Sequence, residues 1–406
     1  MANRQLTETL IKDHKKHGDV VLEQFSEVLE SEKPAYKPAD IDLVACLEHD
    51  FGPKFREVVP RISDDAMEAI ITSGVFNRMA QIMIKTSLRE NPKEAYKLAN
   101  VVPVETRGEC EDSFKDFGVF SDIEVHEVGE LEAGPLYGIA TDYLQHPNGK
   151  PVAAGLAFTR EALCKDPNGF LLQQIPKLRD AHDQYRETKL IDSLIGYNNT
   201  YNRSGTAYSI YYDNADASPF ASGASGPWIN AEASSIVCGS DMQNVRDLFY
   251  DMTDLVHGRI IEMDMDNLDV WTSRQNRDKL LPLLRSTSVE RDVTCPEGDT
   301  QHFYMSPEVA NGMTFNPVGY DRMVEQIALR YSIGVSEARE WIWFGKLAEF
   351  MAWVYQVRPE VNRCPLGANE CQKRIVAVYN SYSKGYSYVK DPHKAVLLTG
   401  TTFESL

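Results

Sequence analysis

The chain has 406 residues, of which 43% are hydrophobic and 25% are charged. This length and composition predict a globular protein with two or three compact units. Acidic residues outnumber basic ones, and the formal net charge is -18. Such a charge argues against a protein that wraps nucleic acid through a basic face, and it favours a protein that stays soluble at high concentration.

The seven cysteines are scattered and form no C-x-x-C pair. An odd number without such pairs predicts reduced thiols in a cytoplasmic setting. The segment from Met1 to Gly18 lacks the apolar run of a signal peptide. The run from Trp341 to Val357 comes nearest to membrane-spanning length, but Lys346 and Glu349 interrupt it. We therefore expect neither a signal peptide nor a membrane segment.

Residues 1–100 have the apolar spacing of helices. Thr7 to Glu30 is amphipathic, and Asp64 to Glu90 carries a wide apolar face that can be buried against a partner or the main body. One basic cluster lies in the first of these helices, and it consists of Lys12, His14, Lys15, Lys16 and His17. A solvated helix face is its simplest interpretation, and contact with nucleic acid is the alternative.

From Thr106 to Thr159 the pattern is that of strands joined by tight turns. Val119–Val128 and Leu136–Leu144 alternate between apolar and polar residues, and a Gly-rich turn separates them. A second turn, His146–Lys150, leads into Pro151–Thr159. A two-stranded ribbon is only marginally stable by itself in water, and its edges carry unpaired backbone groups. We expect this arm to lie on another surface, in the same chain or in a neighbouring one.

The segment from Asp166 to Gly196 is predicted to form one long helix. Asp166 suits the N-cap, Pro167 suits the first helical position, and Gly196 suits the position just beyond the end. Its apolar residues fall at spacings of three and four and form one narrow stripe. We therefore expect the helix to be mostly solvated and to pack on one side only. Pro176 should remove one backbone hydrogen bond and bend the helix.

The remainder of the chain combines short helices, aromatic-rich strands and polar loops. Helices are predicted for Asp241–His257, Thr272–Leu284 and Tyr320–Tyr331. Strands are predicted for Leu268–Trp271, Ala338–Phe344, Phe350–Arg358 and several segments between Lys373 and Thr399. A polar loop is predicted for Cys295–Met313.

No motif of a nucleotide-binding loop, a zinc protease or a nucleophile elbow occurs in the sequence. The acidic run from Glu262 to Asp269 is the best candidate for a cation site. Asp264 and Asp266 match the start of an EF-hand loop, but Leu268 fails the next position and no Gly follows. A strand edge with solvated carboxylates is the simpler interpretation.

Two other groups of residues are candidates for a catalytic or metal site, and neither has the neighbours that such a site needs. Asp299 and His302 lie near Cys295, but nothing in the sequence supports a catalytic triad there, so a polar loop is the simpler interpretation. Cys364 and Cys371 lack the spacing of metal ligands, and no histidine lies near enough in the sequence to complete a site. We therefore expect no catalytic residue, no cofactor and no metal site.

Several patterns together resemble one known family. A strand that ends in T-R-E-A-L (159–163) is followed by D-x-x-G-x-L (166–171), I-P-x-L (175–178) and the long charged helix. The run I-G-Y-N-N-T-Y-N-R-S-G-T-A-Y-S-I-Y (195–211) comes next, and W-x-W-F-G-x-L-A-x-F (341–350) comes later. Between about Val101 and Gly400 the chain resembles the major capsid proteins of tailed bacteriophages, which are the shell proteins of the Hong Kong 97 type.

The resemblance implies an α+β fold of the Hong Kong 97 type. Such a fold has a peripheral domain with a long spine helix and a β-sheet, an axial domain, an extended β-ribbon loop and an N-terminal arm. On this chain the resemblance implies a helical N-terminal arm at 1–105, the extended loop at 106–160, the peripheral domain with the spine helix at 161–235, the axial domain at 236–361 and the return strands of the peripheral domain at 362–406.

The resemblance also implies a structural protein and not an enzyme. It implies a major capsid protein that assembles through hexamers and pentamers into an icosahedral shell around packaged double-stranded DNA. The expected partners are other copies of the chain, a portal, scaffolding or decoration proteins, and DNA contacted without sequence specificity, with no membrane. The expected location is the virion, after assembly in the host cytoplasm. An encapsulin-type nanocompartment shell is an alternative, and a cytoplasmic enzyme with an acidic site is a third.

In the resembled family the extended loop covers the adjacent subunit, so its tip is predicted to make an intersubunit contact. The predicted contact residues are Val128, Glu130, Leu131, Gly134, Leu136 and Tyr137. Some members of the family weld their subunits by a lysine–asparagine bond from this loop. The tip has no lysine here, although Lys150 is nearby in the sequence. Pro176 is the predicted bend of the spine helix, and residues 1–100 are predicted to stay in the shell as an ordered arm.

Overall fold

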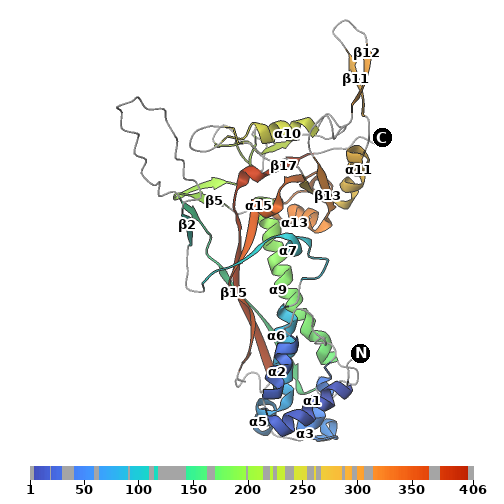
Figure 1. Ribbon diagram of the computed structural model, residues 1–406, viewed down its shortest axis with the longest axis vertical. Coiled ribbons are helices and arrows are strands. Elements are labelled where there is room, and N and C mark those ends of the chain that lie inside the picture. Colours follow the sequence, from blue (N-terminus) through green and yellow to red (C-terminus); the bar gives the residue numbers. More distant parts are fainter. Residues whose placement is uncertain are drawn as a thin grey trace, which may run out of the picture.

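The structure is a computed structural model of the chain. It describes residues 4–18, 20–29, 41–58, 64–89, 92–108, 114–117, 143–161, 170–197, 200–213, 220–222, 226–233, 242–253, 260–261, 267–285, 289–294, 300–305, 314–364 and 375–400. The molecule is elongated, and the long helix α9 (Phe170–Leu194) runs from a group of N-terminal helices at one end to a mixed sheet at the other (Figure 1). Helices and mixed sheets combine in one chain, so the α+β class predicted from the sequence is confirmed.

The N-terminal part is helical, as predicted, but its helices are shorter. They are α1 (Arg4–His17), α2 (Val20–Leu29), α3 (Leu43–Phe51), α4 (Phe55–Val58), α5 (Asp64–Ser73), α6 (Val75–Arg89) and α7 (Lys97–Val101). Gly18 has a φ of 68° and separates α1 from α2, which is a conformation that glycine adopts without a steric penalty. Gly74 separates α5 from α6, because the Asp50 carboxylate accepts hydrogen bonds from Val75 N (3.1 Å) and Phe76 N (2.9 Å) and caps α6 there.

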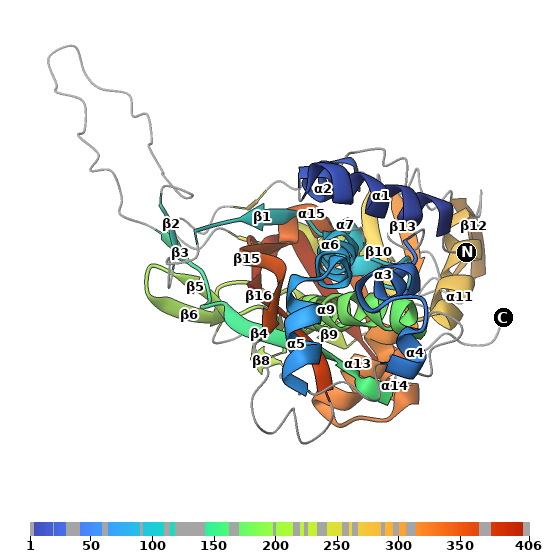
Figure 2. The same cartoon turned by 90° about the horizontal axis from the view of Figure 1, so that it is seen from below.

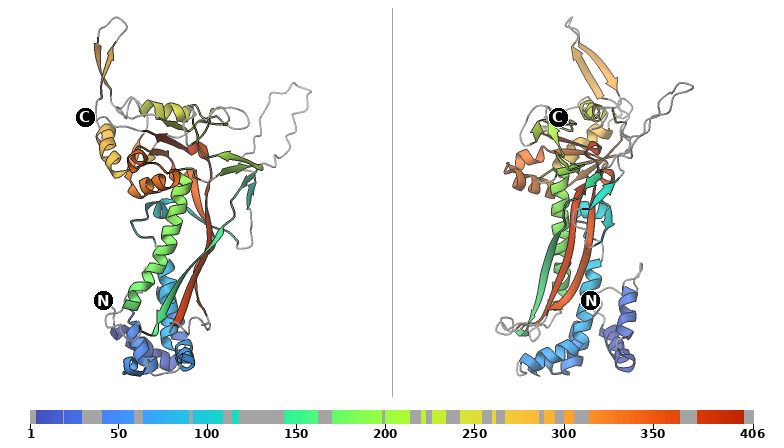
Figure 3. Two further views of the ribbon diagram at one scale, coloured as in Figure 1. Left: turned by 180° about the vertical axis from the view of Figure 1, so that it is seen from behind. Right: turned by 90° about the vertical axis from the view of Figure 1, so that its left-hand side faces the viewer.

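A long four-stranded sheet lies beside α9 (Figure 3). Its order is β1 (Val104–Thr106), β15 (Met351–Cys364), β16 (Ile375–Val389) and β4 (Lys150–Thr159). β15, β16 and β4 run antiparallel, and β1 pairs with β15 in parallel. The sequence predicted that Pro151–Thr159 belongs to an arm that lies on another surface, in the same chain or in a neighbouring one, and β4 pairs here with β16 of the same chain. Its partner strand comes more than 200 residues later, and such a distant pairing leaves no local signal.

A second, seven-stranded sheet has the order β13 (Phe315–Gly319), β10 (Leu268–Thr272), β14 (Ile342–Gly345), β17 (Ala395–Thr399), β9 (Ala231–Ala233), β7 (Tyr212–Asp213) and β8 (Ala221–Ser222). The nearby helices are α10 (Met242–Tyr250), α11 (Arg274–Arg285), α13 (Asp321–Tyr331), α14 (Val335–Arg339), α15 (Leu347–Phe350) and the 3-10 helix η4 (Pro392–Lys394). The sequence grouped the last strand with the return strands. In the structure β17 pairs instead with β14 and β9.

Two smaller sheets complete the described strands. One consists of β2 (Lys115–Phe117), β3 (Tyr143–Gln145), β5 (Thr200–Arg203) and β6 (Thr206–Ser209). The other is a hairpin of β11 (Val289–Thr294) and β12 (Thr300–Met305) that projects from the body (Figure 1). The polar loop predicted for Cys295–Met313 is wrong for Thr300–Met305, which forms β12. The polar composition of this segment favoured a loop, but pairing with β11 stabilises a strand. The predicted strand Val119–Val128 lies outside the described residues.

Several predicted elements agree with the structure. β10 and α13 match the predictions with small shifts at their ends, and α11 begins at Arg274 where Thr272 was expected. The strand predicted from Ala338 begins only at Ile342, because α14 takes up Val335–Arg339. α9 ends as predicted, and Gly196 beyond it has a φ of 72°. The predicted cap residues Asp166 and Pro167 lie outside the described residues.

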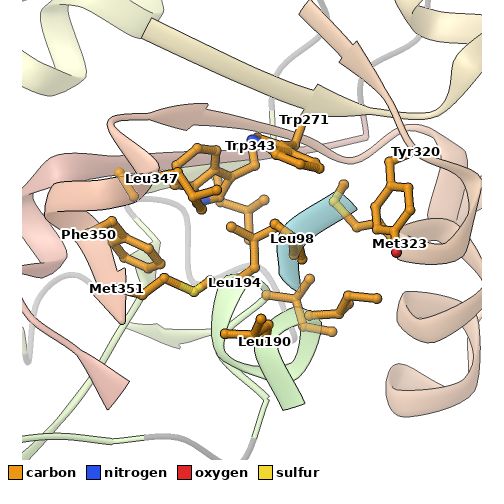
Figure 4. Packing of buried hydrophobic residues seen from close by; sticks show 14 of the residues in the cluster. Leu98, Leu190, Leu194, Trp271, Tyr320, Met323, Trp343, Leu347, Phe350 and Met351 are labelled. Carbon is orange, nitrogen blue, oxygen red and sulfur yellow. The ribbon is translucent and has the colours of Figure 1, made fainter. Parts of the chain in front are cut away.

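Two hydrophobic cores lie at the two ends of α9. The first joins the N-terminal helices to the long sheet and to Leu178 of α9. The view from below shows α3 and α6 beside α9 at this end (Figure 2). Phe158 of β4 belongs to it, with the Phe76 ring at 6.2 Å and the Tyr379 ring at 5.7 Å between centroids. In the second core, Leu190 and Leu194 of α9 are buried among residues of α7, α13 and the seven-stranded sheet (Figure 4).

Candidate functional site

The predicted contact residues at the loop tip lie outside the residues that the structure describes. Val128, Glu130, Leu131, Gly134, Leu136 and Tyr137 all fall within 118–142. The contact that they were predicted to make therefore stays a prediction. α9 continues through Pro176, and the bend predicted there also stays a prediction.

The described structure instead brings buried polar side chains together along the second half of α9. The sequence predicted a mostly solvated helix that packs on one side, and this is wrong for the second half. Residues 190–195 are all buried, and so are the charged side chains of Glu187 and Asp192. Ionic side chains are rarely buried unless they are paired, so the partners of these two carboxylates indicate what this part of the helix does.

Glu187 joins α9 to the segment before the long sheet. Its side chain is 1% exposed, and its two carboxylate oxygens accept hydrogen bonds from Leu98 N (3.0 Å) and Ala99 N (2.7 Å). The Tyr320 hydroxyl, next to α13, donates a further short hydrogen bond to the same carboxylate. Burial raises the pKa of Glu187, and these hydrogen bonds oppose that rise. One carboxylate therefore fixes α7, α9 and the start of α13 relative to one another.

Asp192 joins α9 to α13. Its Oδ1 lies 2.8 Å from Arg330 Nε and its Oδ2 lies 2.9 Å from Arg330 Nη2, which is a bidentate pair. Gln326 Nε2 donates to Oδ1 at 3.0 Å, and Lys189 Nζ approaches Oδ2 at 3.4 Å. The hydrogen bond to Asp192 is the main cause of the raised pKa of Arg330. The pair therefore clamps α13 of the seven-stranded unit onto α9.

His182 and Ser193 join α9 to the long sheet. The two ring nitrogens of His182 lie 2.6 Å from Ser381 Oγ and 3.0 Å from Ser383 Oγ on β16. Ser193 Oγ lies 2.5 Å from Ser387 Oγ on the same strand. Burial lowers the pKa of His182, so the neutral ring is favoured in the folded chain. α9 is thus linked by buried polar contacts to both large sheet-bearing units.

A second polar cluster lies where β2 and β3 lead into the segment that holds the predicted loop. Asp116 of β2 accepts from Arg107 Nη2 at 3.2 Å, and its Oδ2 lies 2.8 Å from His146 Nε2. Tyr386 OH on β16 lies 3.2 Å from His146 Nδ1. Burial lowers the pKa of His146, against the opposing effect of Asp116. The cluster attaches the base of this segment to the long sheet. The Arg107 guanidinium also lies 3.9 Å over the Phe114 ring.

These clusters do not form a catalytic arrangement. Their carboxylates and imidazole rings have charged, neutral polar or backbone partners, as buried structural polar groups do. Within the described ranges no group of three or more His, Cys, Asp or Glu side chains could hold a metal ion. Of the acidic run at 262–269, Asp269 is described and its Oδ1 accepts from Asn316 at 3.2 Å. Asp264, Asp266, Cys295 and Asp299 lie outside the described residues.

No helix in the described part of the chain is long and apolar enough to cross a membrane.

Sequence reasoning missed the anchors on α9 for a simple reason. A charged residue in a helix is usually solvated, and nothing local marks Glu187 or Asp192 as buried. One signal of burial was present in the sequence. Ile191, Leu194 and Ile195 cover more of the helix circumference than the narrow apolar stripe before them does.

No protein-family model and no curated protein matches the chain. Among solved structures, the chain is similar to the capsid of a native GTA particle, with 15% sequence identity, a TM-score of 0.42, and coverage of 77% of this chain and 93% of that chain. It is similar to the mature capsid of bacteriophage PhiM1, with 10% identity, a TM-score of 0.41, and coverage of 75% and 86%. It is also similar to the SrpI encapsulin complex from Synechococcus elongatus, with 9% identity, a TM-score of 0.39, and coverage of 78% and 92%.

Proposed function

We propose that the chain is a subunit of a self-assembling protein shell of the Hong Kong 97 type, and more narrowly the major capsid protein of a tailed bacteriophage. The observation that carries the proposal is the layout of the subunit. A long helix lies beside a four-stranded sheet and runs from the N-terminal helices at one end of an elongated molecule to the seven-stranded sheet at the other, and a two-stranded hairpin, β11–β12, projects from the molecule (Figure 1). Such a hairpin is marginally stable alone, so a neighbouring subunit is its natural support.

The buried anchors of α9 suit this role. A closed shell repeats the same contacts many times, so a subunit needs a fixed internal geometry before its contacts can close into rings. Glu187 and Asp192 fix α7 and α13 to α9, and His182 fixes β16 to α9. In this proposal the two domains have the positions predicted from the sequence. The axial domain lies around the capsomer axes, and the peripheral domain is built on α9 and the long sheet.

The charge of the chain supports a wall that encloses DNA without adhering to it. The net charge of -18 repels phosphate at long range. In this proposal the shell contains double-stranded DNA, a portal occupies one vertex, and the assembled protein is found in virions. The loop tip at Val128–Tyr137 contacts the adjacent subunit.

Sedimentation velocity of the purified full-length chain tests the shell proposal. We expect a narrow, fast-sedimenting species made of many copies, with closed particles in negative-stain images. A discrete 45.8 kDa monomer at all concentrations would contradict it. Nucleic acid content then separates the alternatives. Nuclease-protected DNA in particles from infected cells supports a capsid, and a co-purifying enzyme in DNA-free particles supports an encapsulin-type shell.

The loop tip can be tested separately. Leu131→Asp places a charge in the predicted contact, and Glu132→Asp in the same segment is the conservative control. We expect the first variant to lower particle yield while the circular dichroism of the subunit is unchanged. Equal yields for the two variants would contradict the proposed contact without affecting the shell proposal.

A further inference from the structure

Cationic side chains from two distant segments of the chain meet around Gly319, the last residue of β13. Lys97 of α7 donates from Nζ to the Gly319 carbonyl oxygen at 2.7 Å. Arg274 and Arg277 of α11 lie against the same glycine, and a Cβ atom there would come within 3.0 Å of Arg274 Cα and of Arg277 Cδ. Glycine therefore lets the first turn of α11 approach β13 closely, which brings the three positive charges together.

The nearest acidic side chain does not cancel these charges. Burial is the main cause of the lowered pKa of Lys97, and the charges of Arg274 and Arg277 lower it further. The charge of Asp321 opposes them and has the smallest effect of the four. Asp321 also lies 3.4 Å from Arg274 Nε, but the two side chains are 53% and 73% exposed, so solvent screens the pair. The local potential is therefore positive, although the whole chain has a net charge of -18.

The hairpin β11–β12 carries the opposite charge. Residues 289–305 contain one basic residue, Arg291, and four acidic residues. The acidic residues are Glu290, Asp292, Glu297 and Asp299. The hairpin begins just after α11 ends at Arg285, whereas Arg274 lies at the start of that helix, roughly 17 Å away at about 1.5 Å per residue. It extends away from the body in two different views (Figure 1, Figure 3). The hairpin of one chain therefore points away from the basic residues of its own α11.

We propose that the hairpin β11–β12 of one subunit docks on the basic cluster (Lys97, Arg274 and Arg277) of a neighbouring copy of this chain. The two surfaces differ, so the contact is heterologous and repeats from one subunit to the next around a ring. The inference rests on the proposed function, and it adds the place where the projecting hairpin is supported. A two-stranded hairpin is only marginally stable alone, and a surface of opposite charge favours its docking.

Three arguments favour a second copy over nucleic acid on the basic cluster. The hairpin and the cluster lie at the same end of the molecule, beside the seven-stranded sheet, so one rotation can bring the hairpin of one subunit to the cluster of the next (Figure 1). The net charge of -18 repels phosphate at long range. Arginine is enriched at protein interfaces, and its guanidinium matches the geometry of a carboxylate.

The critical concentration for particle assembly of the purified chain, without DNA, tests this contact. Arg274→Glu reverses the charge of the most exposed member of the basic cluster. Lys177→Glu makes the same change at an exposed position in the first half of α9 and is the control. We expect Arg274→Glu to raise the critical concentration at least about tenfold, because like charges then meet across the contact. Lys177→Glu should leave it unchanged, and circular dichroism shows that both variants fold.

An exchange of charges separates this contact from a general effect of charge on assembly. Glu290→Lys together with Asp292→Lys reverses two acidic residues of β11 and should also raise the critical concentration about tenfold. Combined with Arg274→Glu, these changes should restore assembly to within about threefold of the parent chain, because opposite charges meet again. If the two defects simply add in the combined variant, the docking of the hairpin on the cluster is overturned.

The outcomes distinguish this contact from the shell itself. If the parent chain forms no particles, the shell proposal fails and the contact fails with it. If particles form and Arg274→Glu assembles like Lys177→Glu, the contact is overturned while the shell stands. If Arg274→Glu assembles normally but lowers the DNA content of particles from infected cells, the basic cluster binds nucleic acid and the docking of the hairpin is overturned.

Discussion

The two ends of α9 are held by different chemistry. At the end that carries Leu178, α9 meets the N-terminal helices and the long sheet in an apolar core that contains Phe158. At the other end the apolar contacts of Leu190 and Leu194 are joined by buried carboxylates, each satisfied by several donors. Apolar packing is non-directional, whereas hydrogen-bonded charges fix orientation. We infer that apolar packing at the Leu178 end stabilises the contact of α9 with its neighbours. The hydrogen-bonded carboxylates at the other end set the angle between the two sheet-bearing units.

Removing the Glu187 carboxylate should have the largest effect. Glu187→Leu leaves Leu98 N, Ala99 N and the Tyr320 hydroxyl without their acceptor, and at about 1–3 kcal/mol for each buried unsatisfied group the loss is on the order of 3–9 kcal/mol. Chemical denaturation measures this loss. Glu325→Leu, at an exposed position on α13, is the control and should change stability little. A loss below 1 kcal/mol for Glu187→Leu would contradict the orienting role.

Opening a cavity at the apolar end should have the next largest effect. Phe158 is 1% exposed, and Phe158→Ala is expected to cost about 3–5 kcal/mol in unfolding free energy. Because no charge is involved, the loss should be the same at low and high salt. Leu329→Ala, at a leucine that is 69% exposed, should cost less than about 0.5 kcal/mol. If Phe158→Ala and Leu329→Ala lost equal unfolding free energy, the claim that the apolar core around Phe158 stabilises this end would be contradicted.

The contribution of His182 to the unfolding free energy should depend on pH. Burial holds its pKa below the ordinary value of 6.5, so the neutral ring is favoured in the folded state. Its contribution to stability is therefore full above pH 6.5 and declines as the pH falls below that value. We expect the unfolding free energy of His182→Gln to fall less than that of the parent chain between neutral and mildly acidic pH. Parallel curves would show that His182 does not couple stability to protons.

The surface pair Lys93–Asp180 should have the smallest effect. Its nitrogen and oxygen are 2.5 Å apart, but the side chains are 51% and 26% exposed, so solvent screens the interaction. Lys93→Ala is expected to cost roughly 0–1 kcal/mol, and less at high salt. A loss as large as that of Glu187→Leu would mean that burial does not decide which polar contacts on α9 matter.

Local signals in the sequence predicted part of the fold. The stop of α9 at Gly196, the strand β10 and the helix α13 each depend on a few neighbouring residues, and all three are found close to the predicted positions. The division of the helix predicted from Asp64 depended on Asp50, which lies 25 residues before Val75 in the sequence and caps α6 through space. Such a cap cannot be found from helical periodicity alone.

The anchors of α9 could not be predicted for the same reason. Glu187 is satisfied by donors that lie 89 and 133 positions away in the chain, at Leu98 and Tyr320. The partners of β4 and β17 are likewise distant strands. Periodicity shows which face of an element is apolar, but it does not show which distant element meets that face. The predicted loop tip lies outside the described residues and stays a prediction.

A cryo-EM reconstruction of the purified full-length protein tests the central claim most directly. We expect closed, uniform shells in which each subunit contains α9 as a continuous helix between the N-terminal helices and the seven-stranded sheet. The chain would be shown not to be a shell subunit by a homogeneous sample of 45.8 kDa monomers that forms no particles at any protein or salt concentration.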